Sequence, residues 1–221
     1  MERALVLGAS GGLGQAIFRN LEKQGVAVTG LSRRAGDFDL TDEASIGAAL
    51  GRLNPPFDLI FVATGVLDGA GAEPEKTLKA LTAEALVAQY AVNAIGPALI
   101  LKHGIRLMPR DRRAVFAALS ARVGSIGDNQ MGGWYSYRAA KAGLNQLIHG
   151  AAIEVRRTHR QSICVCLHPG TVATSFTANY AARHKTITPD AAAEALLGVL
   201  SGLTPEDTGS FWDWKGAQVP W

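Results

Sequence analysis

The chain has 221 residues, of which 48% are hydrophobic and 19% are charged. This composition can bury a sizeable core and differs from that of a disordered chain. The length favours one domain over residues 1–221, since domains average about 150 residues. The 22 Lys and Arg residues exceed the 19 Asp and Glu residues by only three, which indicates no particular partner and no nucleic-acid groove.

The cysteines, apolar segments and histidines exclude further classes of protein. Cys164 and Cys166 stand two apart in an apolar run, a pattern typical of a strand and not of a disulfide framework or a redox pair. No uninterrupted apolar segment approaches about 18 residues, so we expect no membrane span, and Met1 precedes no signal-peptide core. We therefore expect a cytoplasmic protein. The histidines show no metal-ligand spacing, which predicts no metal site, and His168 is interpreted as a packed or water-facing side chain.

In chain order, short apolar runs alternate with longer amphipathic segments. The runs are rich in Val, Ile, Leu and Phe and occupy residues 4–7, 26–31, 59–63, 115–119 and 163–167. Runs that are apolar on both faces are typical of parallel strands that helices cover on each side.

Apolar residues spaced by three and four predict helices between these runs. One such pattern starts at Leu13 and another extends from Tyr137 to Val155. The alternation predicts an α/β fold of the Rossmann type, in which helices flank both faces of a doubly wound parallel β-sheet of about seven strands in a single domain. Residues 210–214 alternate in polarity and fit a last edge strand, and the non-periodic segment 173–189 is a candidate substrate lid.

A glycine-rich turn follows the first predicted strand. It carries Gly8, Gly12 and Gly14 and leads directly into an amphipathic helix. Gly8 permits a tight turn off the strand. Gly12 leaves room for a pyrophosphate at the helix N-terminus, and Gly14 lets the helix pack closely on the sheet. The position of the turn between a strand and a helix predicts a dinucleotide site.

The residues about 20 positions after the turn indicate which cofactor binds. Ser32 stands 20 positions after Gly12 and is followed by Arg33 and Arg34, with no carboxylate before Asp37. An acidic residue there would bind a ribose 2′-hydroxyl, whereas a hydroxyl and guanidinium groups favour a 2′-phosphate. The sequence therefore predicts that NADP(H) binds in preference to NAD(H). If one of the two arginines is only a solvent-exposed loop charge, it is Arg34 and not Arg33.

Tyr137 and Lys141 are four positions apart in a predicted helix and therefore share one of its faces. A nearby ammonium group favours the phenolate and is expected to lower the pKa of Tyr137 from its ordinary value of about 10. That change would make Tyr137 a usable proton donor to a carbonyl oxygen near neutral pH. Tyr135 is a competing phenol, but no lysine follows it at the same spacing.

The glycine-rich turn and the Tyr137–Lys141 pair together resemble the short-chain dehydrogenase/reductase family, and the likeness extends over nearly the whole chain. Residues 120–127 and 133–138 are most similar to its sniffer-type carbonyl reductase and C-factor branch. The resemblance implies a cofactor half of about residues 1–110 and a catalytic and substrate half of about residues 111–221.

Further segments are similar to the cofactor motifs of the family. Asp39-Leu40 resembles its acidic-aliphatic pair beside the adenine, Ala63-Thr64-Gly65 stands where it has an Asn-Asn-Ala-Gly motif, and residues 169–174 resemble the segment that closes over the nicotinamide. The resemblance therefore implies that the cofactor is bound by Gly8, Ser10, Gly11, Gly12, Leu13, Gly14, Ser32, Arg33, Arg34, Asp39, Leu40, Ala63, Thr64, Gly65, Tyr137, Lys141, Pro169, Gly170, Thr171, Val172 and Thr174.

The family's catalytic set contains an asparagine and a serine besides the tyrosine and the lysine. Asn93 stands in a segment similar to the family's Asn-x-x-Gly helix and is implied as the asparagine. Ser120 directly follows the predicted strand 115–119, as the serine should, but it stands 17 positions before Tyr137, a longer spacing than is usual in the family. Ser125 stands 12 positions before Tyr137. The strand-end position favours Ser120, with Ser125 as the alternative.

The resemblance implies an enzyme that transfers a hydride between NADP(H) and a small carbonyl or alcohol substrate. Tyr137 would exchange the proton with the substrate oxygen, and the serine hydroxyl would stabilise that oxygen. Lys141 would bind the nicotinamide ribose and pass protons through a water held by Asn93. The alternative is a non-catalytic NADP(H)-binding signalling or redox-sensing protein of C-factor type. The likeness further implies a homodimer or homotetramer formed through the helix of Asn93 and the helix 137–155.

Overall fold

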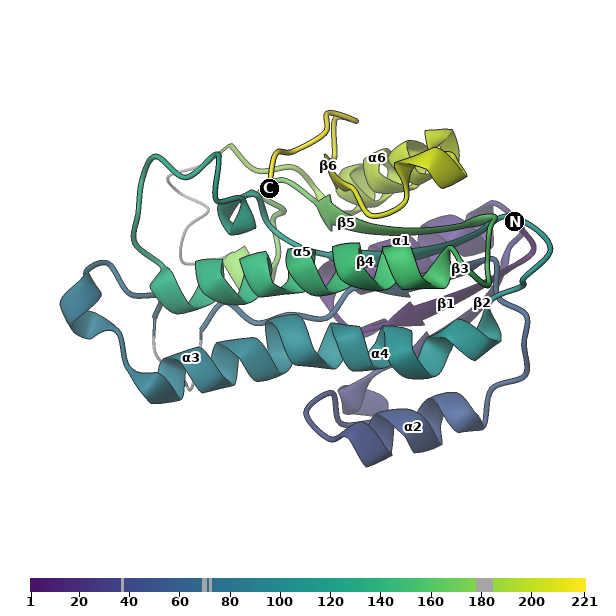
Figure 1. The fold of residues 1–221 in the computed structure, drawn as a ribbon, viewed down its shortest axis with the longest axis horizontal. Helices are drawn as coiled ribbons and strands as arrows, with labels where there is room; N and C mark the ends of the chain where they lie inside the picture. The colour runs from purple at the N-terminus through teal and green to yellow at the C-terminus, as the bar shows by residue number, and fades with distance from the viewer. Residues whose placement is uncertain (37, 69–70, 72, 178–184) are drawn as a thin grey trace.

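The computed structural model describes residues 1–36, 38–68, 71, 73–177 and 185–221. Its centre is a sheet of six parallel strands in the order β2-β1-β3-β4-β5-β6 (Figure 1). The strands are β1 (Arg3–Leu7), β2 (Ala27–Leu31), β3 (Leu59–Val62), β4 (Ala114–Leu119), β5 (Ser162–His168) and β6 (Phe211–Asp213). The predicted parallel fold is confirmed, and the last edge strand is present as β6.

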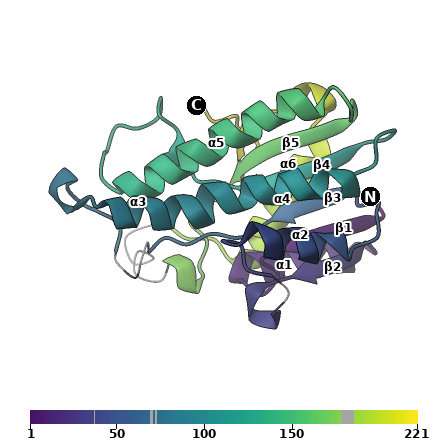
Figure 2. The ribbon, with the colours of Figure 1, turned by 60° about the horizontal axis from the view of Figure 1, so that its bottom comes forward.

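Helices cover both faces of the sheet (Figures 1 and 2). On one face, α1 (Gly12–Lys23) packs beside α6 (Pro189–Gly202). The other face carries α2 (Glu43–Gly51), α4 (Gly96–Gly104) and α5 (Tyr135–Val155), and α3 (Ala83–Tyr90) packs against α5. The fold is therefore doubly wound, as the alternation of apolar runs predicts.

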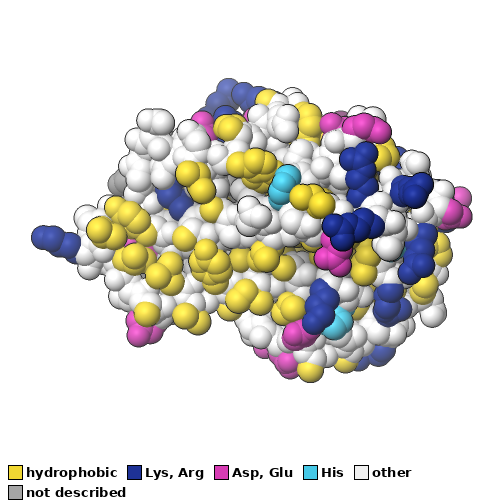
Figure 3. Space-filling model, in the orientation of Figure 1, with side chains coloured by type: hydrophobic (Ala, Val, Ile, Leu, Met, Phe, Trp, Pro, Cys, Tyr) yellow, Lys and Arg dark blue, Asp and Glu magenta, His cyan; other side chains and the backbone are white. Residues whose placement is uncertain are grey.

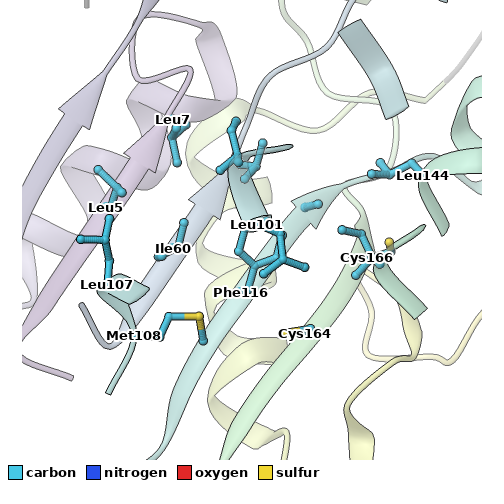
Figure 4. Close-up of a cluster of buried hydrophobic side chains, with 14 of the residues drawn as sticks. Leu5, Leu7, Ile60, Leu101, Leu107, Met108, Phe116, Leu144, Cys164 and Cys166 are labelled. Carbon is cyan, nitrogen blue, oxygen red and sulfur yellow. The ribbon is translucent and has the colours of Figure 1, made fainter. Parts of the chain in front are cut away.

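The sheet divides the core into two clusters because successive strand residues point to opposite faces. Figure 4 shows part of the cluster on the α5 side, to which Phe116, Cys164 and Cys166 contribute. Their neighbours Val115 and Val165 pack instead against α1 and α6. Both faces of each central strand are thus buried, which is why the runs are apolar throughout.

β2 is one edge of the six-stranded sheet, and a connection with little regular structure leads from it to α2. After β2 the chain forms a short 3-10 helix at Arg33–Ala35. The described residues from there to Asp42, the N-cap of α2, form no strand. The residues of β2, an edge strand like β6, are only half-buried or exposed.

Residues 83–107 form one continuous helical run through α3, a π-helical segment at Ala91–Ile95, α4 and a 3-10 turn. By length and composition this run is able to cross a membrane, although polar and charged residues such as Asn93 and Lys102 interrupt it, so the absence of a membrane span stays a prediction. The core helix of a globular protein passes the same test. In the structure the run packs against α2 and α5, which accounts for its apolar face.

Asp58 connects the starts of three strands. Its carboxylate accepts hydrogen bonds from the backbone N–H groups of Glu2 and Arg3 and from the Arg112 guanidinium, 2.9 Å away. Burial acts to raise the pKa of this carboxyl, but the hydrogen bonds from Glu2 and Arg3 and the Arg112 cation outweigh it, and the pKa lies below its ordinary value. The ionised carboxylate therefore stabilises the folded state.

We expect Asp58→Asn to lower the free energy of unfolding by about 1–3 kcal/mol near neutral pH, because hydrogen bonds to a charged group are lost. A carboxyl whose pKa is lowered by folding stabilises the protein above its unfolded pKa of about 3.9 and loses that contribution as the pH falls through the folded value. Urea unfolding near pH 7 and near pH 3 measures this, and a difference between variant and wild type that does not shrink at low pH would contradict the account.

Candidate active site

A cavity of about 460 Å³ opens at the carboxyl ends of the parallel strands, where α/β sheets bind their ligands. Its wall is formed by segments that directly follow β1, β3, β4 and β5, together with one face of α5. The lining residues are Gly11, Gly12, Leu13, Ala63, Thr64, Gly65, Val66, Leu67, Asp68, Leu119, Ser120, Ala121, Tyr137, Lys141, His168, Pro169, Gly170, Val172, Thr174, Ser175, Phe176 and Thr177.

The glycine-rich turn has the geometry that its sequence predicts. Gly8 has a φ of +85°, in the region that favours glycine, and its N–H donates to the carbonyl of Leu31 at the end of β2. A Cβ on Gly14 would lie only 2.2 Å from the carbonyl oxygen of Gly8. Gly14 therefore allows the close approach of α1 to the turn.

The N-terminus of α1 borders the cavity. Its N-cap is Gly11, no side chain caps it, and its first turn carries no acidic residue. The backbone N–H groups there are oriented to bind an anion. A Cβ on Gly12 would meet the Thr174 side chain at 2.7 Å, so the turn and the segment after β5, both predicted to contact the cofactor, meet across the cavity.

Tyr137 and Lys141 project from α5 into the cavity wall, and both are buried. The Lys141 Nζ donates to the carbonyl of Leu119 at 2.8 Å and lies 5.8 Å from the centre of the Tyr137 ring. Burial lowers the pKa of Lys141 to about 8. Burial raises the pKa of Tyr137 well above its ordinary value, so the expected lowering is wrong for the protein alone, and the phenol keeps its proton at neutral pH.

The two candidate serines lie in different surroundings. Ser120 follows β4 and lines the cavity, and its hydroxyl donates to Asn145 Oδ1 on α5 at 2.6 Å. Ser125 is buried outside the cavity lining, and its hydroxyl accepts a hydrogen bond from the N–H of Asp128 within a turn. Only Ser120 of the two is therefore placed to contact a ligand in the cavity.

Asn93 lies in the π-helical segment and is fully buried. Its side chain donates to the Val66 carbonyl at 2.8 Å and to Gln89, and it accepts from the Val66 N–H at 3.2 Å. All of its hydrogen-bonding groups are thus used within the protein, and Asn93 does not line the cavity. Its side chain positions the segment after β3, beside Gly65 and Lys141.

Several residues predicted to contact the cofactor lie beyond the cavity. Arg33 and Arg34 are exposed on the 3-10 helix, where the Ser32 hydroxyl accepts from the N–H of Ala35. The Asp39 carboxylate accepts from Thr41, and these hydrogen bonds lower the pKa of Asp39. The predicted residues outside the lining are Gly8, Ser10, Gly14, Ser32, Arg33, Arg34, Asp39, Leu40, Asn93 and Thr171.

The cavity also contains residues that the sequence did not assign to it. Val66, Leu67 and Asp68 continue directly from the predicted Ala63-Thr64-Gly65 segment, so their position after a strand was an available signal. Phe176 comes from the candidate lid, of which residues 178–184 lie outside the described part of the chain. His168 lines the cavity at the end of β5, whereas the sequence favoured a packed or water-facing role.

The start of α5 depends on a contact from a distant loop. Trp134, the N-cap of α5, has a φ of +51° and donates its N–H to the Glu75 carbonyl. The buried Glu75 carboxylate accepts from the N–H of Ser136 at 3.3 Å. Tyr137 follows directly, and the Trp134 ring packs edge-on against its ring, with centres 6.2 Å apart. Glu75 therefore fixes the turn of helix that carries Tyr137.

The residues of the cavity fit a dinucleotide with a nicotinamide ring. The N-terminus of α1, which no side chain caps, supplies backbone N–H groups for phosphate. Thr64 Oγ1 is buried without a hydrogen-bond partner among the described residues, which fits a polar ligand in the cavity. Within the described ranges, no group of three or more His, Cys, Asp or Glu side chains is arranged to hold a metal ion.

Comparison with known proteins identifies the family. Residues 8–212 match the family model described as enoyl-(acyl carrier protein) reductase. One relative is 1-hydroxy-2-glutathionyl-2-methyl-3-butene dehydrogenase of Rhodococcus sp. strain AD45. Its sequence is 30% identical to this chain, and the alignment covers the whole length of both. The chain thus belongs to the short-chain dehydrogenase/reductase family of oxidoreductases, as its motifs predict.

Two further likenesses fit the predicted branch. The C-signal protein of Myxococcus xanthus is 33% identical over 60% of this chain and 76% of its own length. The crystal structure of an NADPH-bound carbonyl reductase from chicken fatty liver superimposes with a TM-score of 0.83 at 23% identity, over 100% of this chain and 99% of that one. The structural likeness establishes the fold.

We expect Glu75→Ala to lower the free energy of unfolding by about 0.5–2 kcal/mol, because the N-terminus of α5 loses its capping acceptor. Glu73→Ala is the matched control, since Glu73 lies in the same loop and is exposed. Urea unfolding of both variants measures the difference. Equal stability of the two variants would show that Glu75 does not cap α5.

Proposed function

We propose that this chain is an NADP(H)-dependent oxidoreductase that transfers a hydride between the nicotinamide and a carbonyl or alcohol substrate. The observation that carries the proposal is the meeting of Tyr137, Lys141 and Ser120 in one cavity, which the glycine turn and N-terminus of α1 also border. The carbonyl reductase likeness supports this substrate class.

NADP(H), when bound, supplies or accepts the hydride at its nicotinamide ring. Tyr137 holds a proton that burial keeps on the phenol, and it donates this proton to the carbonyl oxygen during reduction. Lys141, partly neutral near pH 8 when no ligand is bound, binds the cofactor ribose and attracts negative charge that develops on Tyr137. Ser120 contacts the same substrate oxygen and orients it toward Tyr137.

The choice of NADP(H) rests on the exposed edge beside β2. Arg33 and Arg34 extend into solvent there, and no ion pair engages either of them among the described residues. The nearest described carboxylate in sequence, Asp39, is held by Thr41. Besides the Thr41 hydrogen bonds, the Arg33 cation acts through space on the Asp39 carboxylate and contributes to lowering its pKa, so a 2′-phosphate would compete with that carboxylate for the guanidinium groups.

We also propose that the chain forms a homodimer or homotetramer through α5 and the helical run 83–107 that carries Asn93. Hydrophobic side chains gather over α3, α4 and α5 on the face shown in Figure 3. Val87, Ile95, Leu147 and Ile153 on these helical segments are large, apolar and exposed. A second copy of this face would bury them, as interfaces of this kind do.

A non-catalytic sensor of NADP(H) is the alternative. A sensor that only binds the cofactor needs no proton donor. Burial of a phenol costs free energy, and in such a protein no function would require that cost. The placement of Tyr137 therefore favours the enzyme.

We expect Tyr137→Phe to abolish carbonyl reduction while leaving NADPH affinity within about twofold, because the phenyl ring keeps the packing and loses only the proton. NADPH consumption in the presence of a panel of aldehydes and ketones measures turnover, and fluorescence titration measures binding. Tyr135→Phe is the control, since Tyr135 does not line the cavity. Turnover that survives in Tyr137→Phe would contradict the assigned role.

We expect Arg33→Asp to weaken NADPH binding by about tenfold or more and to leave NADH binding unchanged or improved, since a carboxylate repels the 2′-phosphate. Arg160→Asp changes the same charge at an exposed site just before β5, at the edge of the sheet opposite to the carboxyl ends of the strands, and controls for net charge. Equal losses for NADPH in the two variants would contradict a specific contact at Arg33.

A further inference from the structure

A long loop joins the two residues that we place on the substrate oxygen. Ser120 and Tyr137 both line the cavity, but they stand 17 positions apart in the chain. Between them, residues 121–134 contain one 3-10 turn, Arg122–Gly124, and are otherwise irregular. An irregular connection of this length can adopt many conformations. Groups that act on one oxygen must nevertheless be held closely, since a displacement of about 1 Å can cost about 10²-fold in rate.

The end of this loop is a strained left-handed turn. Gly132, Gly133 and Trp134 have φ angles of +63°, +65° and +51°, and Trp134 is the N-cap of α5. A residue with a side chain rarely adopts a positive φ, so the conformation of Trp134 persists only where neighbouring contacts hold it. The Glu75 carbonyl, which accepts from the Trp134 N–H, supplies one such contact from outside the loop.

Arg138, near the N-terminus of α5, supplies two further contacts. Its Nε donates to the carbonyl of Gly133 at 2.9 Å, and its Nη1 donates to the carbonyl of Val123 at 3.2 Å. One guanidinium therefore binds the loop both near its start and near its end. The side chain is half-buried and forms no ion pair among the residues that the structure describes, so its charge is used on backbone carbonyls.

An arginine is well suited to such a contact. Its guanidinium is planar and presents N–H groups in a fixed fork, so the two carbonyls that it binds are held at a fixed separation. Hydrogen bonds from a charged donor are also stronger than those between neutral groups. Arg138 does not line the cavity, so it would act on the reaction through the groups that it holds.

We propose that Arg138 is a positioning residue, which ties the loop to α5 and thereby sets Tyr137 relative to Ser120. This inference rests on the proposed function. Val123 stands only three positions after Ser120. Gly133 stands only four positions before Tyr137. The two carbonyls that Arg138 binds are therefore close in the chain to the two groups whose relative placement matters.

This tie should matter more for proton transfer than for cofactor binding. Apart from Tyr137 and Lys141, the residues predicted to bind the cofactor lie outside the loop 121–134 and outside α5. Loss of the tie should therefore lower kcat and leave the affinity for NADPH nearly unchanged.

The kinetic test removes the guanidinium and keeps the aliphatic stem. We expect Arg138→Met to lower kcat about tenfold or more for the carbonyl compound that the wild type reduces fastest, with KM and the Kd of NADPH changed by less than about twofold. Arg138→Lys keeps the charge but lacks the fork, so it should recover only part of kcat. Arg156→Met is the matched control, since Arg156 is exposed at the other end of α5.

Hydrogen exchange gives a second readout that needs neither cofactor nor substrate. The N–H groups of Trp134 and Ser136 both donate to Glu75. In Arg138→Met these two amides should exchange about tenfold faster, because the turn that carries them loses its second support. The amide of Phe116, a fully buried residue of β4, should exchange at the wild-type rate, which shows that the fold is intact.

Unchanged kcat in Arg138→Met would overturn this inference and leave the proposed function standing. Full recovery of kcat in Arg138→Lys would also overturn it, because the charge and not the fork would then be responsible. Faster exchange throughout the sheet together with weaker NADPH binding would show that Arg138 supports only the fold. A wild type that binds NADPH but reduces no carbonyl compound would overturn the proposed function and the role of Arg138 in it, and the exchange of Trp134 and Ser136 would then still show whether Arg138 holds the loop.

Discussion

The parallel pairing of the strands is the constraint on which the site depends. Because β1, β3, β4 and β5 run in the same direction, their carboxyl ends meet at one edge of the sheet. The strands are apolar throughout because helices cover both faces, so polar side chains first become possible where the strands end. Thr64, Ser120 and His168 stand at those positions, and the cavity forms between them. A change of one residue in register would turn Ser120 and His168 to the opposite face.

Burial then sets the chemistry of the groups that α5 adds. Lys141 lies in the wall of the cavity with its Nζ bonded to a strand carbonyl, and its pKa falls to about 8. Tyr137 keeps its proton for the same reason. An ammonium group is costly to bury without a partner, and the Leu119 carbonyl supplies one for Lys141. Glu75, from a distant loop, holds the start of the helix that carries Tyr137. The catalytic wall is thus held in place by long-range hydrogen bonds.

The sequence predicts the elements of this fold and many of the cavity residues, because apolar runs and helical spacing are local patterns. Gly8, Tyr137 and Lys141 could be assigned in this way. The contacts of Glu75, Asn145 and His168 could not, since each joins segments far apart in the chain and depends on strand register or helix packing. The predicted lowering of the Tyr137 pKa was wrong for a related reason. The lysine four positions away can be read from the sequence, but the burial that raises the pKa and outweighs the effect of the lysine cannot.

Titration calorimetry of the unmodified protein with NADPH, and in parallel with NADH, tests the central claim most directly. The account predicts saturable binding of NADPH with one site per chain and weaker binding of NADH, because the glycine turn binds the pyrophosphate of either cofactor and only the 2′-phosphate meets Arg33. Tighter binding of NADH would contradict the role of Arg33 while leaving the cavity as a dinucleotide site. Failure to bind either cofactor would contradict the account of the cavity as an oxidoreductase site.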